Sequence, residues 1–194
     1  MDSERVKIKD SEVLSDDWYV LNKVTFDYLR NDGEWQTQVR ESYDRGNGAT
    51  VFMYNKETKN IVLIRQFRLP SYLNGNKNGL LIETCAGLLD ADDPETCIKK
   101  EILEETGYQV EKVTKVFEAY MTPGAVTEQI HYFIAEYTSS MKSTQGGGLH
   151  TEQEDIEVLE MPFSEAVSLL NEGKIKDAKT IMLLQYALIH KLVE

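Results

Sequence analysis

Residues 86–90, AGLLD, and residues 100–108, KEILEETGY, carry the most informative pattern in this chain. Acidic residues between them lead to Pro94, and proline suits the first helical position because its φ is fixed and its missing N–H costs nothing there. We therefore expect a helix to begin at Pro94. Asp92 or Asp93 is expected to cap it, because a short carboxylate can accept from the first free backbone N–H groups.

The expected helix ends at Gly107, since glycine accepts the left-handed conformation that terminates helices. Glu101, Glu104 and Glu105 are spaced i, i+3 and i+4, so at about 100° per residue an α-helix gathers them on one side. Like charges one turn apart repel each other. They become favourable around a hard cation such as Mg²⁺ or Mn²⁺. On these residues alone, a metal site and a solvated acidic face both remain open.

Length and composition favour one acidic domain with an appendage. The chain has 194 residues and a formal net charge of −12. Such a chain without a Lys/Arg cluster is a poor candidate for binding nucleic acid. It contains no run of about 18 apolar residues, so we expect no membrane span. Cys85 and Cys97 make no disulfide framework and are expected to be buried thiols of a reduced, cytoplasmic protein.

The N-terminal part predicts an arm. Residues 18–28 and 35–43 read as two strands, and the Asn-Asp-Gly sequence at 31–33 between them is a strong hairpin signal. We expect residues 1–44 to form this arm and dimerisation region, followed by a larger domain over residues 45–194.

The remainder alternates strands and helices. Turn and cap signals place a surface loop around Pro70, and they place Ser164 as the cap of a later helix. A loop over residues 139–153, which contains three consecutive glycines, is expected to be mobile and to act as a lid. Strands are expected at 49–54, 61–67, 80–83, 112–119, 129–137 and 156–160, and helices at 165–171 and 178–192.

The string from Gly87 to Gly107 resembles the Nudix box, Gly-x5-Glu-x7-Arg-Glu-x-x-Glu-Glu-x-Gly, the signature of hydrolases that act on nucleoside diphosphates linked to another group. Asp93 stands in place of the first Glu, Lys100 replaces the Arg, and the box is one residue short between them. Lys100 can still pair with Glu104. The resemblance implies an α/β (α+β) fold, a Nudix-type α/β/α sandwich with a mixed sheet, preceded here by the antiparallel hairpin arm. The matching positions are Gly87, Glu101, Glu104, Glu105 and Gly107.

The resemblance extends beyond the box. RQFR at 65–68, and Pro123 fifteen positions beyond Tyr108, look like the nucleoside-diphosphate-sugar branch that includes ADP-ribose pyrophosphatases. YDRGNGAT, VLIRQFR, ETCAGLLD, EETGY, GGGLH and EDIEVLE are similar, in order and spacing, to the bacterial GDP-mannose pyrophosphatase family. This implies Mg²⁺-dependent hydrolysis of GDP-mannose to GMP and mannose 1-phosphate. The alternatives are an ADP-ribose or ADP-sugar pyrophosphatase of the same fold, and a non-catalytic nucleotide-sugar sensor, which the retained helix carboxylates disfavour.

The resemblance also implies a metal centre for Mg²⁺, with Mn²⁺ as the alternative ion. Glu154 is the candidate general base and would reach the metal from the lid, while Glu128 is the alternative base. Glu104 would orient or balance the cluster. The implied catalytic residues are Glu101, Glu105 and Glu154. The implied metal ligands are the carbonyl of Ala86 and the carboxylates of Glu101, Glu105 and Glu154.

The implied substrate-binding residues are Trp18, Val39, Arg40, Glu41, Arg68, Ala86, Gly87, Leu88, Glu105, Glu128, Gln153, Glu154 and Lys179. Arg68 could instead be an ordinary edge-strand cation, and Lys179 could cap the preceding loop. Arg40 and Glu41 could form a solvated surface pair. In the related enzymes such arms help to complete the partner subunit's site, so we expect a homodimer formed through the arm.

Overall fold

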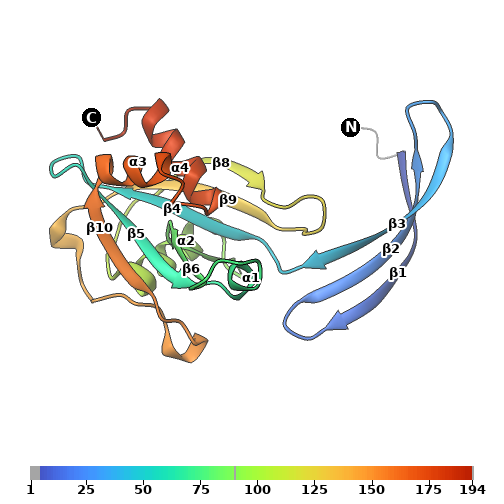
Figure 1. Cartoon of the computed structure of the whole chain (residues 1–194), viewed down its shortest axis with the longest axis horizontal. Coiled ribbons are helices and arrows are strands. Elements are labelled where there is room, and N and C mark those ends of the chain that lie inside the picture. The colour runs from blue at the N-terminus through green and yellow to red at the C-terminus, as the bar shows by residue number, and fades with distance from the viewer. Residues whose placement is uncertain (1–4, 90, 194) are drawn as a thin grey trace. The chain divides into compact units, whose positions relative to one another are not determined.

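The computed structural model describes residues 5–89 and 91–193. Residues 1–4 of the expected arm and Asp90 of the acidic loop lie outside this described part. The chain divides into two compact units. One comprises Met1–Asn47 with Tyr120–Gln129, and the other comprises Gly48–Ala119 with Ile130–Glu194 (Figure 1).

The first unit is built on a three-stranded antiparallel sheet in the order β1-β2-β3. Its strands are β1 (Val6–Asp16), β2 (Val20–Leu29) and β3 (Trp35–Asp44). The predicted hairpin of β2 and β3 is confirmed, and Gly33 adopts a φ of 88° in its turn, which glycine accepts without strain. β1 was not predicted. Every residue of β1 is exposed, so backbone pairing with β2, rather than burial of one face, defines this strand.

The segment of residues 120–129 pairs with the end of β3. The Tyr43 N–H donates to the Ala125 carbonyl at 2.8 Å, and the Thr127 N–H donates to the Tyr43 carbonyl at 3.1 Å. These bonds explain why a loop distant in sequence belongs to the first unit.

The second unit contains a mixed seven-stranded sheet. Its main path runs β10-β5-β4-β9-β8, with β6 paired to β5 and β7 paired to β4. The pairing of β4 with β9 is parallel, whereas β4 pairs antiparallel with β5 and β7. The strands are β4 (Gly48–Tyr54), β5 (Asn60–Phe67), β6 (Leu80–Glu83), β7 (Ala86–Leu88), β8 (Thr114–Tyr120), β9 (Gln129–Glu136) and β10 (Glu157–Pro162).

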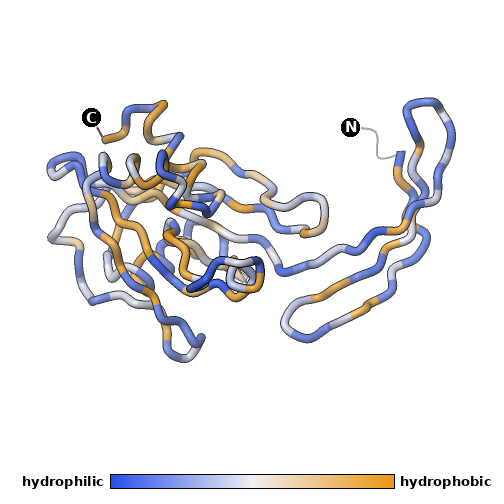
Figure 2. The backbone as a smooth tube through the Cα atoms, viewed as in Figure 1, coloured by the Kyte–Doolittle hydropathy of each residue, from blue (hydrophilic) through white to orange (hydrophobic). Residues whose placement is uncertain are grey.

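Helices cover both faces of this sheet, which confirms the predicted sandwich. Val51 and Met53 of β4 belong to the buried cluster that contains Ile98 of α2. The intervening Phe52 points to the other face, where its ring centroid lies 5.9 Å from that of Phe163, as the alternation along a strand requires. β5 contains a run of hydrophobic residues, while the turn that precedes this strand is hydrophilic (Figure 2). The helices are α1 (Leu69–Leu73), α2 (Pro94–Glu101), α3 (Phe163–Asn171) and α4 (Ala178–Ile189).

Three local predictions were wrong. The surface loop expected around Pro70 begins with α1, which has proline in its first turn and thereby follows a common helix-start preference. α3 begins at Phe163, so Ser164 lies inside the helix and Pro162 occupies the N-cap position. α4 ends at Ile189, three residues before the expected Leu192.

Candidate active site

The helix of the predicted box begins as expected. Asp93 is its N-cap, and its Oδ1 accepts from the N–H groups of Glu95 at 3.0 Å and Thr96 at 3.2 Å. These bonds satisfy two of the donors that every helix start leaves free. Lys100 bonds to Asp92, in place of the predicted partner Glu104. The shorter acid at position 93 therefore serves the helix start, while Lys100 ties the helix back to the loop before it.

The box helix is not α-helical throughout. α2 ends at Glu101, and residues Ile102–Thr106 form a π-helix that ends at Gly107 with a φ of 76°. A π turn is wider than an α turn and is frequent at functional sites. The acids also differ in burial: Glu105 is 1% exposed, whereas Glu101 and Glu104 are only partly buried.

The segment that joins β6 to β7 brings two of these carboxylates to the backbone. The Ala86 N–H donates to Oε2 of Glu105 at 3.1 Å. A Cβ atom at Gly87 would lie 1.9 Å from Oε1 of Glu101, so only glycine lets this carboxylate rest against the main chain. Ala86, Gly87, Glu101 and Glu105 are thus brought together as the sequence predicts.

The electrostatics of this cluster suit a hard cation. Burial raises the pKa of Glu105 to about 8; the Cys85 thiol and the Ala86 N–H oppose the shift, and the charges of Glu101 and Glu154 add to it. A divalent ion would remove the cost of keeping these groups ionised together. Within residues 5–89 and 91–193, no set of three or more His, Cys, Asp or Glu side chains is already gathered as a metal site.

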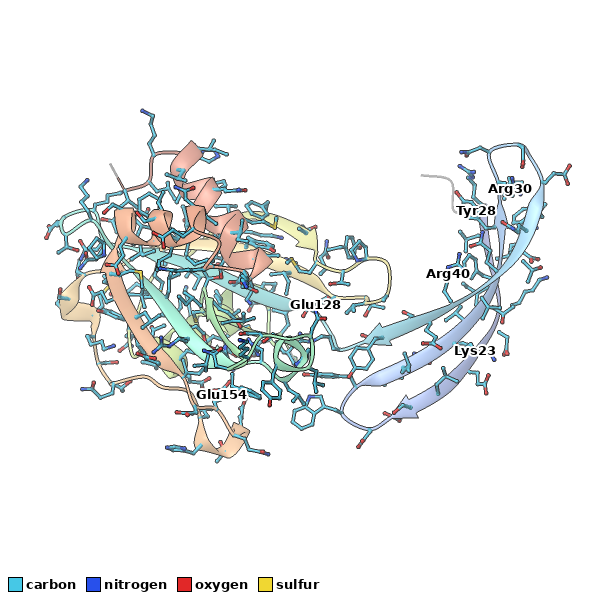
Figure 3. The ribbon with its side chains drawn as sticks, in the orientation of Figure 1. Lys23, Tyr28, Arg30, Arg40, Glu128 and Glu154 are labelled. Atoms are coloured by element: carbon cyan, nitrogen blue, oxygen red, sulfur yellow. The ribbon has the colours of Figure 1, made fainter. Side chains whose placement is uncertain are left out.

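Glu154 lies on the loop that leads into β10 (Figure 3). Its Oε2 accepts from the Leu149 N–H at 2.9 Å. Earlier in the same loop, the N–H groups of Gly147 and Gly148 donate to the carbonyls of Glu105 at 2.9 Å and Glu104 at 3.1 Å. These bonds hold the loop against the π-helix that carries the acids. That the loop over residues 139–153 is mobile and acts as a lid stays a prediction.

Arg68 and Lys179, predicted to bind substrate, meet on Glu83. Arg68 donates from Nε to Oε1 and from Nη2 to Oε2, both at 2.9 Å, and Lys179 donates to Oε2 at 2.6 Å. Burial opposes ionisation of Glu83, but the hydrogen bonds from Arg68 and the charge of Lys179 lower the pKa of Glu83 to about 2. Arg68 and Lys179 are thus both partners of one buried carboxylate.

The start of α4 differs from the alternative considered for Lys179, a cap of the preceding loop. Asp177, rather than Lys179, caps α4: its Oδ2 accepts from the Thr180 N–H at 2.9 Å. Lys179 donates to Oδ1 of the same Asp177 at 2.8 Å. Lys179 thus bridges a helix cap and a buried strand carboxylate.

Two of the remaining predicted residues belong to the second unit: Leu88 ends β7, and Gln153 precedes Glu154 on its loop. The others belong to the first unit. Trp18 lies between β1 and β2 and is 76% exposed. Arg40 donates to the carbonyl of Val39 at 2.8 Å and to Gln38 at 3.1 Å. These bonds replace the surface pair with Glu41 that was the alternative for Arg40. The register places Glu41 opposite Lys23. Glu128 forms an ion pair with Arg45 at 3.3 Å.

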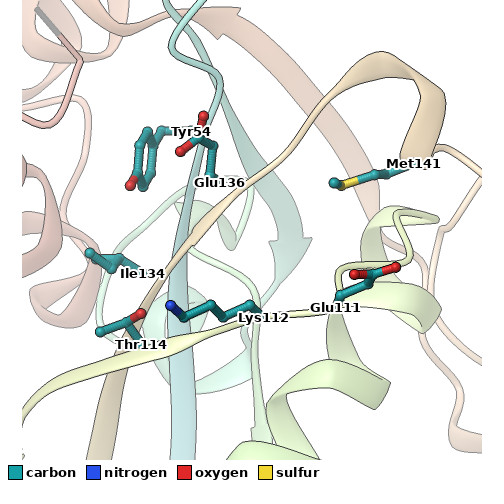
Figure 4. A pocket seen from close by; sticks show the side chains of 7 residues that line it. All are labelled: Tyr54, Glu111, Lys112, Thr114, Ile134, Glu136 and Met141. Carbon is teal, nitrogen blue, oxygen red and sulfur yellow. The ribbon is translucent and has the colours of Figure 1, made fainter.

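A pocket with a volume of about 290 Å³ lies elsewhere in the second unit (Figure 4). Its lining residues are Tyr54, Glu111, Lys112, Thr114, Ile134, Glu136 and Met141. They include none of the residues that the sequence predicts for the site.

Sequence reasoning missed Glu83, Asp177 and Cys85. A usable signal existed for Glu83, because a charged residue closes the otherwise apolar strand Leu80–Glu83, and buried charges need specific partners. Asp177 precedes a predicted helix and fits the cap pattern. Nothing in the pattern around Cys85 indicates that its thiol faces Glu105.

Two family models match the chain. One, described as the NUDIX domain, matches residues 44–184, and one described as the GDP-mannose pyrophosphatase NudK N-terminal domain matches residues 5–43. Proteins named GDP-mannose pyrophosphatase are similar over nearly the whole chain. That of Yersinia enterocolitica is 56% identical, covering 97% of this chain and 99% of its own length. That of Pectobacterium atrosepticum is 54% identical, with 96% of each chain covered, and that of Escherichia coli O1:K1 is 52% identical, covering 99% and 100%.

In the part of the chain that the structure describes, no helix has the length and apolar character needed to cross a membrane.

Proposed function

The chain belongs to the Nudix family and is a Nudix pyrophosphatase, and from this premise we propose that it hydrolyses the pyrophosphate bond of GDP-mannose, with Mg²⁺, to GMP and mannose 1-phosphate. The observation that carries the proposal is the carboxylate of Glu105, which is 1% exposed and lies beside the Ala86 N–H and Glu101. Carboxylates that repel each other favour the binding of a cation between them. The bound cation can in turn attract an anionic substrate. The similarity to proteins named GDP-mannose pyrophosphatase supports the choice of substrate.

We propose that the carbonyl of Ala86 and the carboxylates of Glu101, Glu105 and Glu154 hold the ion. When bound, a divalent ion stabilises charge on phosphate oxygens and lowers the pKa of a bound water. Gly87 leaves room for Glu101 against the backbone. Mn²⁺ is the alternative ion, because both ions prefer oxygen ligands.

The chain's own residues would orient the reactants and move the proton. Glu154 is the proposed base: it comes from a loop bonded to the π-helix, so it can face the other acids without sharing their helix. Glu128 stays the alternative base. Arg68 and Lys179 would donate to the anionic substrate, and Gly87 and Leu88 would line its path.

The first unit would contribute to substrate binding through Trp18, Val39, Arg40, Glu41 and Glu128, and Gln153 would contribute from the loop of the second unit. Trp18 is exposed enough to stack on a base. We propose that the arm ends at residue 44 and that the catalytic domain begins at residue 45. We also propose a cytoplasmic location.

We further propose that the arm forms a homodimer. Val6, Ile8, Val13, Trp35 and Val39 are all more than 40% exposed on one small sheet, and a monomer leaves such apolar surface in water at a cost. Sedimentation velocity of the full chain is expected to give the dimer mass, and Trp35→Glu is expected to shift the protein toward monomer. A wild-type protein that sediments as a monomer at micromolar concentration would refute this proposal.

The substrate is tested by ³¹P NMR after incubation with Mg²⁺ and, separately, GDP-mannose, GDP-glucose, ADP-ribose or ADP-glucose. We expect GMP and a sugar 1-phosphate chiefly from GDP-mannose, and no turnover in EDTA. Preferential cleavage of ADP-ribose would keep the fold and chemistry but replace the substrate. Binding of GDP-mannose without turnover under any of these conditions would favour the sensor alternative.

A further inference from the structure

We propose that Glu83 is a positioning residue of this site: it holds Arg68 and Lys179 in fixed orientations, so that their remaining N–H groups face an anionic substrate. The inference rests on the proposed function, because it takes these two cations as substrate-binding groups. It adds a residue for which the sequence suggested no role.

The contacts of Glu83 restrain both cations. Its carboxylate is 1% exposed and accepts three hydrogen bonds, two from Arg68 in parallel and one from Lys179. A parallel pair between a guanidinium and a carboxylate fixes the plane of the arginine as well as its distance. Glu83 therefore defines where Arg68 points, which a single bond would not do.

With respect to the residues that the structure describes, both cations keep donors for a ligand. An ammonium carries three N–H groups, and Lys179 uses one on Glu83 and one on Asp177. A guanidinium carries five, and Arg68 uses two on Glu83. The Arg68 side chain is 39% exposed, so a ligand can reach its unused edge. A long side chain that is already ordered loses less entropy on binding, which improves affinity.

The geometry of these contacts, in addition to the balance of charge, favours positioning. Arg68 alone already compensates the charge of Glu83, and the bidentate geometry satisfies both oxygens. Lys179 is a second cation, 13% exposed, and it is drawn to the same place by Asp177. Two carboxylates and two cations make a neutral cluster that tolerates burial while presenting N–H groups outward.

The same short segment connects this cluster to the acids of the box. The Thr84 N–H donates to Oγ1 of Thr180 at 2.7 Å, and the Cys85 carbonyl accepts from the Val51 N–H at 3.0 Å. The next residue, Ala86, donates to Glu105. Successive backbone groups are thus fixed to α4, β4 and the π-helix. The backbone of residues 84–86 therefore connects two parts of the proposed site rigidly. Glu83, with its two cations, lies at one end of this segment, and Glu105 contacts the other end.

The test is Glu83→Gln in the full-length protein, assayed with GDP-mannose and Mg²⁺. The amide keeps the size of the side chain but turns an N–H toward one of the two cations. We expect KM to rise about tenfold or more while kcat changes by less than about threefold, because binding common to ground state and transition state is lost. Glu83→Asp, which keeps the charge, is expected to recover most of the affinity.

Glu157→Gln is the matched control. Arg65 of β5 donates from Nε to Glu157 of β10 at 2.7 Å, so this variant breaks a carboxylate–arginine pair that lies outside the cluster. Its KM is expected to equal that of the wild type. A KM for Glu83→Gln that also equals the wild-type value would overturn the inference, whereas absence of turnover by the wild type would refute the proposed function instead.

Two further measurements separate positioning from a purely structural role. If Glu83 acts through Arg68, the double variant of Glu83→Gln with Arg68→Ala raises KM by less than the product of the single effects; equality with the product overturns the inference. In ¹H–¹⁵N spectra of the protein without substrate, the Nε–H of Arg68 is expected to exchange slowly with water and to lose this protection in Glu83→Gln. Unchanged protection would also overturn it, whatever the activity.

Discussion

Replacing Glu105 by Gln is expected to stabilise the protein in EDTA and to remove its activity. Glu105 is 1% exposed, and burial raises its pKa from 4.5 to about 8. At pH 7 the folded protein must hold this carboxyl mostly protonated, while the unfolded chain ionises it. The difference of about 2.5 units between pH 7 and the unfolded pKa, at about 1.36 kcal/mol per unit, corresponds to about 3 kcal/mol of lost stability.

A glutamine does not ionise, and its amide oxygen can still accept from the Ala86 N–H. In EDTA at pH 7, Glu105→Gln should therefore raise the free energy of unfolding by about 3 kcal/mol, or the melting temperature by roughly 6–12 °C for a chain of this size. A group whose folded pKa is raised contributes its full stability below its unfolded pKa, and that contribution is lost as pH rises. The difference between variant and wild type should thus vanish below pH 4.5 and grow up to about pH 8.

The assay is urea denaturation in EDTA from pH 4 to pH 8, repeated with Mg²⁺, together with turnover of GDP-mannose. Mg²⁺ should stabilise the wild type but not Glu105→Gln, and turnover should fall about 100-fold or more. Glu95→Gln, an exposed acid that pairs with Lys99 on the same helix, is the control and should change none of these. A variant that is less stable in EDTA, or one that keeps near-normal turnover, would refute the reasoning.

Three other perturbations test the fold and the site. Gly87→Ala should lower Mg²⁺-dependent turnover about tenfold or more in steady-state assays, because the added Cβ would occupy the place of the Glu101 carboxylate; normal turnover would show that Glu101 can move without loss. Asp93→Ala should lower the free energy of unfolding by about 1 kcal/mol in urea titrations through loss of the N-cap, and Asp93→Asn should restore most of it. Acidification should destabilise the protein as pH falls from 4.5 toward about 2. Because the pKa of Glu83 is lower in the folded than in the unfolded chain, the ionised carboxylate stabilises the fold above pH 4.5, and this stability is lost as Glu83 is protonated. Circular dichroism should show that the stability of Glu83→Gln depends less on pH over this range.

Local chemistry made several features predictable from the sequence. Pro94 and Gly107 bracket the box helix because one has a fixed φ and the other accepts a left-handed one. The Asn-Asp-Gly turn joined β2 to β3 as predicted, since its residues tolerate the turn geometry. The resemblance of the box and its flanking strings to the Nudix family identified the sandwich and the acids of the candidate site.

Only the tertiary structure decided which partners these residues have. Glu105 lies in the π-helix that follows Glu101 and is 1% exposed, and residue spacing alone indicated neither the π-helix nor this burial. Glu83 and Lys179 are 96 residues apart in the chain, and no periodicity relates a strand end to a distant helix start. The strand β1 is set by hydrogen bonds to β2 while its side chains stay exposed. Sequence patterns report local conformation and burial, whereas ion pairs, backbone pairing and desolvation depend on which segments the fold brings into contact.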